Sequence, residues 1–239
     1  MLGFGTFRLT PSDAYDMTLQ SLRTGYRLID TAQLYKNEES VQRAIVDSGV
    51  PRDDIFLITK IHKCTMSMLE ERIKIFGQID CLLLHYPTEK FLQDWTFLCK
   101  NQPPNIKHLG VSNFKQHHLD EASQVRKPYC NEIEVTPFWT RKDLVQYNQA
   151  HAIITIAHSP LTKAEKFDDP RLVAMADRYH TTPSTLMINW SLQRQYWALP
   201  RTSSTAHLQQ NWARLEIQEH DLAIMDSWDE CYATHPQYR

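Results

Sequence analysis

The stretch that decides the fold reads Gly25-Tyr26-Arg27-Leu28-Ile29-Asp30-Thr31-Ala32-Gln33-Leu34-Tyr35-Lys36-Asn37-Glu38. It begins as an apolar run typical of a short buried strand and ends with a carboxylate and a phenol, Asp30 and Tyr35. Two later strand-like runs, Ile55–Lys60 and Cys81–His85, also end in a titratable side chain. Parallel β/α barrels carry their chemistry at the carboxyl ends of their strands. The repeated pattern therefore predicts that a barrel brings these four side chains together.

The rest of the chain alternates between strand-like and helix-like runs, and no shift in composition marks a linker. The expected strands cover 2–7, 26–30, 55–59, 80–84, 107–111, 129–135, 153–158 and 197–199. The expected helices cover 11–24, 38–48, 66–76, 89–99, 115–124, 141–150, 170–179, 183–192, 206–213 and 219–232. The alternation favours an α/β fold, a single (β/α)8 TIM barrel over residues 1–239, above an open doubly wound sheet.

The composition limits the kinds of partner that we expect. The 239 residues carry a formal net charge of −2 and show no basic block, which argues against nucleic acid as a partner. No window of about 18 apolar residues exists, so we expect no membrane-spanning helix. The N-terminal sequence lacks the pattern of a signal peptide, and a cytoplasmic monomer is the expected state.

The cysteines and histidines do not predict a metal site. The five cysteines are odd in number, widely spaced and free of any Cys-x-x-Cys pair. This pattern is typical of free thiols in a reducing compartment. No His-x-x-x-His pair with a carboxylate is present, so we expect no metal.

Asp30, Tyr35, Lys60 and His85 together form a set that suits proton donation to a carbonyl oxygen. A phenol has a pKa of about 10, and a nearby ammonium group lowers that value by favouring the phenolate. A carboxylate can hold the ammonium group in place, and a histidine can orient the carbonyl. Each residue alone has a plainer explanation as a packing residue, a solvated charge or a buried histidine. Their convergence at three successive strand ends favours the catalytic interpretation.

The sequence around these residues resembles the aldo-keto reductase family. The resemblance is carried by Gly25–Glu38, Leu83–Pro87, Gly110–Phe114, His158–Leu161 and Leu199–Ser204, and it extends from Leu2 to about Glu230. It implies a (β/α)8 barrel that reduces aldehydes or ketones with NADPH. It also implies roles for the four residues: Tyr35 as the proton donor, Asp30 and Lys60 as the groups that tune it, and His85 as the group that orients the carbonyl.

The resemblance implies a cofactor site and a substrate site as well. The cofactor set comprises Thr6, Phe7, Asp30, Ser112, Asn113, Glu132, His158, Ser159, Leu161, Arg201, Thr202, Ser203, Ser204, His207, Gln210 and Asn211. The substrate set comprises Phe7, Tyr35, His85 and Tyr86. Arg201 with its hydroxyl neighbours at a helix start suits a phosphate, although a capped helix start alone explains the same residues. No Gly-x-Gly-x-x-Gly occurs, so a Rossmann domain is not supported.

Several positions depart from the family pattern. Glu132 stands where the family usually has Gln, and an ionised Glu accepts hydrogen bonds but cannot donate them. His158 stands where an aromatic ring usually stacks on the nicotinamide, and a protonated His158 would repel the oxidised ring. His207 replaces a second Arg, which leaves NAD(H) as the alternative to NADP(H). Tyr86 replaces a common Trp.

The sequence begins almost at the first expected strand, and the connection from His85 to Gly110 is short. We therefore expect a barrel without the usual N-terminal hairpin and with shortened loops, in which Phe7, Tyr86 and Tyr232 border an open, shallow pocket.

Two other functions remain open from the sequence. One is a nucleotide-binding barrel that acts as a non-catalytic sensor or scaffold, which the unusual Glu132 and His158 allow. The other is an alcohol dehydrogenase with the same machinery that acts on a sugar or a steroid, because fold and catalytic set do not specify the substrate.

Overall fold

A computed structural model describes residues 1–238, and eight parallel strands form the centre of the molecule. The strands are β1 (Phe4–Gly5), β2 (Leu28–Asp30), β3 (Phe56–Ile61), β4 (Ile79–Leu84), β5 (Ile106–Ser112), β6 (Cys130–Glu134), β7 (Ile154–His158) and β8 (Trp197–Leu199). Each strand pairs with the next in sequence, and a parallel bridge between Leu2 and Ala198 joins the last strand to the first. The predicted (β/α)8 barrel is therefore confirmed.

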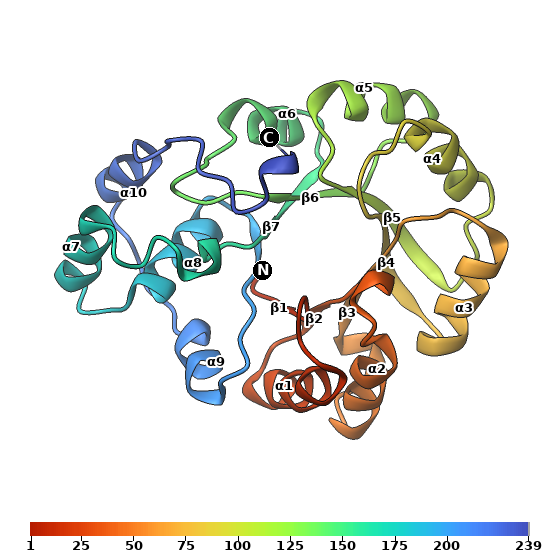
Figure 1. The fold of residues 1–239 in the computed structure, drawn as a ribbon, viewed down its shortest axis with the longest axis horizontal. Coiled ribbons are helices and arrows are strands. Elements are labelled where there is room, and N and C mark those ends of the chain that lie inside the picture. The colour runs from red at the N-terminus through yellow and green to blue at the C-terminus, as the bar shows by residue number, and fades with distance from the viewer. Residues whose placement is uncertain (239) are drawn as a thin grey trace.

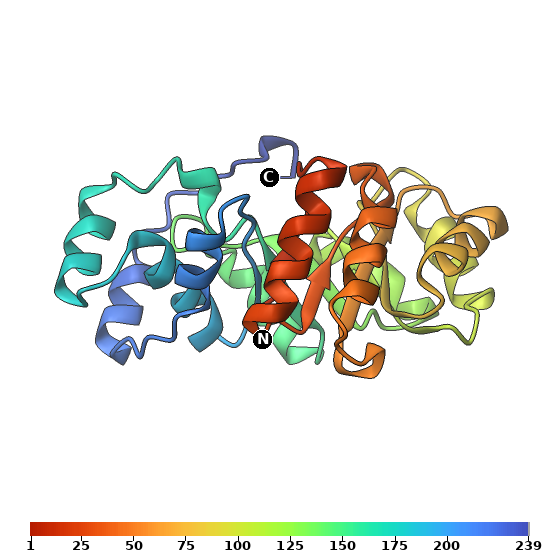
Figure 2. The same cartoon turned by 90° about the horizontal axis from the view of Figure 1, so that it is seen from below.

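Helices surround the ring of strands (Figure 1). They are α1 (Pro11–Thr24), α2 (Glu38–Asp47), α3 (Met66–Phe76), α4 (Phe91–Lys100), α5 (Gln116–Val125), α6 (Lys142–Ala150), α7 (Pro170–Arg178), α8 (Pro183–Gln193), α9 (Thr205–Trp212) and α10 (Glu219–Asp226). The connection from β7 to β8 contains both α7 and α8. Figure 2 shows the N-terminus on one side of the barrel and the C-terminal segment on the opposite side.

Two apolar cores hold the barrel together. Inside the ring, a small cluster includes Leu28, Ile58, Leu83, Ile156 and Leu199. A larger cluster lies between the strands and the helices. Because most strand residues face one core or the other, the strands read as nearly continuous apolar runs, which is typical of a parallel sheet covered on all sides.

Capping residues determine where two helices next to the strand ends, α1 and α9, begin or end. Helix α1 starts with Pro11, and the Thr10 side chain accepts a hydrogen bond from the Asp13 backbone N–H. It ends at Gly25, whose φ of 116° lies in the left-handed region that favours glycine. Helix α9 starts after Ser204, whose side chain accepts a hydrogen bond from the backbone N–H of His207. These caps set where β2 begins and where the loop after β8 turns away from the barrel.

The C-terminal helix is shorter than the predicted range 219–232. Helix α10 ends at Asp226, and the chain then crosses the face of the barrel that carries the strand ends. The backbone N–H groups of Glu230 and Tyr232 donate to the carbonyl oxygen of Phe138, and that of Thr234 donates to the Glu134 carboxylate. The prediction was wrong beyond Asp226 because these backbone groups find partners on the barrel instead of within a helix.

We predict that Gly110→Ala destabilises the barrel by about 1–3 kcal/mol, because overpacking a tight core forces backbone shifts. A Cβ at this position would lie 2.6 Å from both Cys130 Sγ and Leu83 Cδ2. Gly49→Ala is the matched control: its φ of 69° is strained for alanine, but a Cβ there meets nothing within 4 Å. Urea unfolding should show a larger loss for Gly110→Ala. An equal loss in both variants would contradict close packing between β4, β5 and β6.

Candidate active site

Lys60 lies at the centre of a buried cluster at the carboxyl ends of the strands. Its side chain is 1% exposed and forms ion pairs with Asp30 and with Glu132 Oε1, the latter at 3.2 Å. Its ammonium group also donates to the Tyr35 hydroxyl at 3.4 Å and to the Thr31 carbonyl oxygen at 3.2 Å. The fold therefore brings Asp30, Tyr35 and Lys60 together, as the sequence predicted, and adds a second carboxylate that the sequence did not link to Lys60.

A short helical turn after β2 delivers the Tyr35 hydroxyl to Lys60. Residues Gln33–Tyr35 form a 3-10 turn, η1. Asn37 anchors the loop: its amide donates to the carbonyl oxygens of Thr6 and Leu9, and its side-chain oxygen accepts from Thr31. Because these partners lie on the β1 and β2 loops, Tyr35 sits on a fixed support rather than a mobile loop.

Burial controls the protonation of this cluster. It raises the pKa of Tyr35 above its ordinary value, and the Lys60 ammonium opposes that shift without cancelling it. The predicted effect of the ammonium group therefore has the expected sign, but burial decides the net direction of the Tyr35 pKa shift. Burial also acts to lower the pKa of Lys60, but Asp30 and Glu132 outweigh it, so the pKa of Lys60 is raised. The site thus holds a protonated phenol beside a permanent cation.

His85 follows β4 and faces Tyr35. The two rings meet edge to face with centroids 5.8 Å apart. Burial, helped by the Lys60 charge, lowers the pKa of His85 to about 3, so the ring is neutral. Its Nδ1 atom has no hydrogen-bond partner among residues 1–238. A neutral imidazole that lines the cavity beside Tyr35 can donate or accept a hydrogen bond there.

Beyond Lys60, a chain of hydrogen bonds links β5, β6 and β7. Ser112 Oγ donates to the Glu132 backbone carbonyl, and the Asn113 amide donates to Ser112 Oγ, each at 3.0 Å. His158 contacts Asn113 Oδ1 through Nε2 at 3.0 Å and Ser159 Oγ through Nδ1 at 3.2 Å. Burial lowers the pKa of His158 to about 3, which disfavours the protonated ring that would repel an oxidised cofactor.

A cavity of about 650 Å³ opens above this cluster. Among the predicted site residues, those that line it are Phe7, Asp30, Tyr35, His85, Asn113, Glu132, His158, Ser159, Leu161, Arg201, Thr202, Ser203, Ser204, His207, Gln210 and Asn211. Thr6, Lys60 and Ser112 are buried behind the lining. Tyr86 packs beside His85 with ring centroids 5.6 Å apart and is not a lining residue, and neither is Tyr232, whose hydroxyl donates to Glu165.

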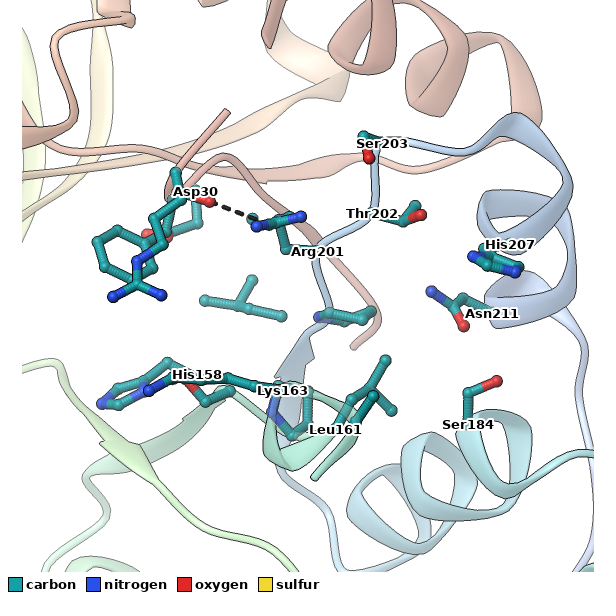
Figure 3. A pocket seen from close by; sticks show the side chains of 18 of the residues that line it. Asp30, His158, Leu161, Lys163, Ser184, Arg201, Thr202, Ser203, His207 and Asn211 are labelled. Carbon is teal, nitrogen blue, oxygen red and sulfur yellow. Dashed lines mark hydrogen bonds between the residues drawn. The ribbon is translucent and has the colours of Figure 1, made fainter. Parts of the chain in front are cut away.

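The cavity runs from the barrel mouth to the start of α9 (Figure 3). Asp30 and His158 lie at one end, and His207 and Asn211 on α9 lie at the other, with Ser184 on α8 facing them. The loop after β8, which contains Arg201, forms one wall. An elongated molecule that crosses the barrel mouth fits this shape.

Several residues that line the cavity were not predicted from the sequence, including Arg8, Lys163, Phe167, Ser184 and His235. The cations Arg8 and Lys163 sit in loops next to predicted site residues, so their proximity in sequence could have indicated them. His235 lies in the C-terminal tail, beyond the end of the helix predicted over 219–232. It packs against the rings of Phe7 and His158, with centroids 6.1 Å and 5.8 Å away. No local pattern places this segment over the site.

Charge is unevenly distributed along the cavity wall. The carboxyl groups of the lining, Asp30 and Glu132, belong to the buried cluster at the barrel mouth. The cations Arg8, Lys163 and Arg201 lie along the loops. Arg201 donates through Nε to the Phe7 carbonyl oxygen at 3.1 Å, which holds the guanidinium at the wall. Cations, hydroxyl groups and a helix N-terminus together favour a ligand with phosphate groups.

Comparison with known proteins agrees with this geometry. The sequence model of the Aldo/keto reductase family matches residues 1–233. The chain belongs to the aldo/keto reductase family. A protein of Mycolicibacterium vanbaalenii named aldo-keto reductase is 32% identical, with 96% of this chain and 88% of the relative aligned. Glycerol 2-dehydrogenase (NADP(+)) of Saccharomyces cerevisiae is 31% identical, with 95% and 86% aligned.

A solved structure shares the fold of this aldo/keto reductase. The aldo/keto reductase of Brucella melitensis has a TM-score of 0.88 and 28% identity, and the match covers 95% of this chain and 94% of that one. Three predictions are confirmed: the family, the activity class of an oxidoreductase, and NADP(H) as the cofactor that this family uses.

The sequence predicted neither a metal site nor a membrane-spanning helix in this aldo/keto reductase. Within residues 1–238, no group of three His, Cys, Asp or Glu side chains is arranged to hold a metal ion. Over the same residues, each helix is too short or too polar to cross a bilayer.

Proposed function

We propose that this aldo/keto reductase reduces aldehydes or ketones with NADPH, and that Tyr35 is the general acid. The observation that carries the proposal is the position of Lys60. One ammonium group touches the Tyr35 hydroxyl and is held by two carboxylates beneath a cavity. No nucleophile or metal is needed for proton donation at such a site.

The shape and charge of the cavity suit nicotinamide adenine dinucleotide phosphate, NADP(H). Its length, the cations of its loop wall and the hydroxyl groups before α9 support phosphate binding at the α9 end. Asn113 and Ser112 offer amide and hydroxyl groups at the other end, next to His158. The name of the yeast relative, which includes NADP(+), supports the same choice of cofactor. We also propose that the whole chain forms one catalytic domain, and that the protein is a cytoplasmic monomer.

The chain's own residues then prepare the carbonyl for reduction. When bound, the reduced cofactor supplies a hydride to the carbonyl carbon. The Tyr35 hydroxyl gives its proton to the carbonyl oxygen, and the Lys60 ammonium stabilises the phenolate that forms. The neutral His85 ring hydrogen-bonds the same oxygen and fixes its direction. Water returns a proton to Tyr35, and an alcohol leaves.

NADPH consumption with a reactive aromatic aldehyde tests this function. Turnover by the wild-type protein supports a reductase. Tight NADPH binding, measured by fluorescence quenching, without turnover on a panel of aldehydes and ketones would instead favour the non-catalytic nucleotide-binding barrel. Faster oxidation of sugar or steroid alcohols than reduction of any carbonyl would favour the alcohol dehydrogenase.

We expect Arg201→Met to weaken NADPH binding by about tenfold to hundredfold, the range of a lost hydrogen bond to a charged group. NADH lacks the 2′-phosphate, so its binding affinity should fall little in this variant. Fluorescence titration with both cofactors measures the difference. Arg214→Met is the matched control, because that arginine is exposed and stacks on Trp212 outside the cavity. An equal loss of affinity for NADH and NADPH would show that Arg201 does not bind the 2′-phosphate.

A further inference from the structure

Glu132 places a second carboxyl group in the proposed active site. It lies on β6, is 2% exposed and borders the cavity. Its Oε1 atom pairs with Lys60 at 3.2 Å, whereas Oε2 accepts no hydrogen bond from residues 1–238. Asp30 also pairs with the Lys60 ammonium group, so two buried carboxyl groups flank one cation.

The charge of this cluster therefore depends on one proton. Lys60 supplies a single positive charge. With both carboxyl groups ionised, the cluster carries a net charge of −1, and with one protonated it is neutral. Burial, reinforced by the Asp30 charge, raises the pKa of Glu132, so this proton leaves at a higher pH than from an ordinary glutamate. The titration belongs to the pair of carboxyl groups rather than to either one.

The other titratable groups around Glu132 keep their charge near neutral pH. Burial raises the pKa of Tyr35 and of Cys130, which keeps the phenol and the thiol protonated. Burial lowers the pKa of His85 and of His158 to about 3, which keeps both rings neutral. Lys60 stays charged because Asp30 and Glu132 outweigh its burial and raise its pKa. The carboxyl pair is thus the part of this cluster whose charge changes.

We propose that Glu132 makes the relative affinity of the site for oxidised and reduced cofactor depend on pH. The inference rests on the proposed function, in which the ring that gives up the hydride must reach a carbonyl held by Tyr35 and His85. That end of the cavity is bordered by Glu132. The oxidised nicotinamide ring is positively charged and the reduced ring is not, so a cluster at −1 attracts the oxidised form selectively. Glu132 is then a residue that favours the oxidised cofactor, the form that alcohol oxidation requires, as the pH rises.

The test is the ratio of the dissociation constants of NADP⁺ and NADPH, measured by titration calorimetry of the intact protein. We expect wild-type protein to shift this ratio in favour of NADP⁺ by about tenfold, or ~1.4 kcal/mol, between about pH 6 and about pH 9. The phosphate groups titrate in both cofactors, so their effect cancels in the ratio. Calorimetry in two buffers of different ionisation enthalpy should also show more protons released on binding NADP⁺ than on binding NADPH.

Two glutamine variants identify the group responsible. Glu132→Gln removes the charge with little change in size and should make the ratio independent of pH. Glu134→Gln is the matched control on the same strand. Glu134 accepts hydrogen bonds from Thr234 and the backbone of His235, and these partners outweigh burial to lower its pKa, so it stays ionised over this range. The Glu134→Gln protein should keep the pH dependence.

Each outcome decides the inference. A wild-type ratio that does not change with pH overturns it, whether or not Glu132→Gln folds. An unchanged pH dependence in Glu132→Gln also overturns it, because another group would then be responsible. Failure of either cofactor to bind the wild-type protein would overturn the proposed function, and with it this inference. A flat ratio with normal turnover would leave the proposed function intact and reject only the role of Glu132.

Discussion

Replacement of Tyr35 with Phe is expected to lower kcat for carbonyl reduction by about 10²–10⁴-fold, the usual contribution of a general acid. The variant lacks only the hydroxyl that Lys60 contacts at 3.4 Å. The phenyl ring can keep its contacts with Phe7 and His85. Because the lost proton is needed in the transition state, kcat should fall while the affinity for NADPH stays near the wild-type value.

Steady-state kinetics and fluorescence titration with NADPH measure these two effects separately. Tyr147→Phe is the matched control, since the Tyr147 hydroxyl donates to Asp120 on the outer helices and is remote from the cavity. Its kcat should equal that of the wild-type protein. Undiminished kcat in Tyr35→Phe would reject the phenol as the acid, and a large loss of NADPH affinity would assign Tyr35 to binding instead.

The positions of the active-site residues were predictable because a parallel barrel fixes them. Asp30 ends β2, Lys60 lies near the end of β3, and His85 follows β4 directly. Strands that pair in sequence order bring consecutive strand ends together, so recognising three strands was sufficient to predict the cluster. The near-continuous apolar runs of these strands carried that information in the sequence.

Protonation states and cross-barrel pairs were not predictable in this way. The sequence indicated that Lys60 would lower the pKa of Tyr35, but the net direction depends on how completely the neighbouring loops exclude water. The pairing of Glu132 with Lys60 joins β6 to β3, strands that are not neighbours in the sheet. Such a contact depends on side-chain length across the barrel mouth, which strand spacing does not specify.

The C-terminal segment shows a second limit. Its composition suits a helix up to Tyr232, yet the chain leaves the helix at Asp226. The reason is a distant partner, the buried Glu134 carboxylate, which accepts hydrogen bonds from Thr234 at 2.6 Å and 2.8 Å. Tertiary hydrogen bonds of this kind override local helix propensity and have no signature in the segment itself.

Replacement of Lys60 with Met is expected to abolish activity and to destabilise the fold by about 3–5 kcal/mol, the cost of removing one partner from a buried ion pair. Methionine fills similar space but leaves Asp30 and Glu132, 3% and 2% exposed, with no cation between them. The remaining carboxyl groups would hold their protons more tightly in the folded protein than in the unfolded chain. Urea unfolding at several pH values measures the loss.

The pH dependence gives this prediction a specific sign. In Lys60→Met the folded-state pKa values of Asp30 and Glu132 lie above their unfolded values, so the folded state binds more protons. Their favourable contribution is fully present below the unfolded pKa values and is lost as pH rises through the folded ones. The variant's deficit relative to wild type should therefore be larger at about pH 8 than at about pH 5.

Lys107→Met provides the matched control for a lysine–carboxylate pair at the surface. Lys107 pairs with Asp80 at 2.8 Å, but its side chain is 45% exposed and Asp80 keeps Arg52 as a partner. This variant should lose at most about 1 kcal/mol, because solvent screens exposed pairs. Equal losses in the two variants, or a deficit in Lys60→Met that shrinks as the pH rises, would contradict a buried cluster in which Lys60 is the cation between the two carboxyl groups.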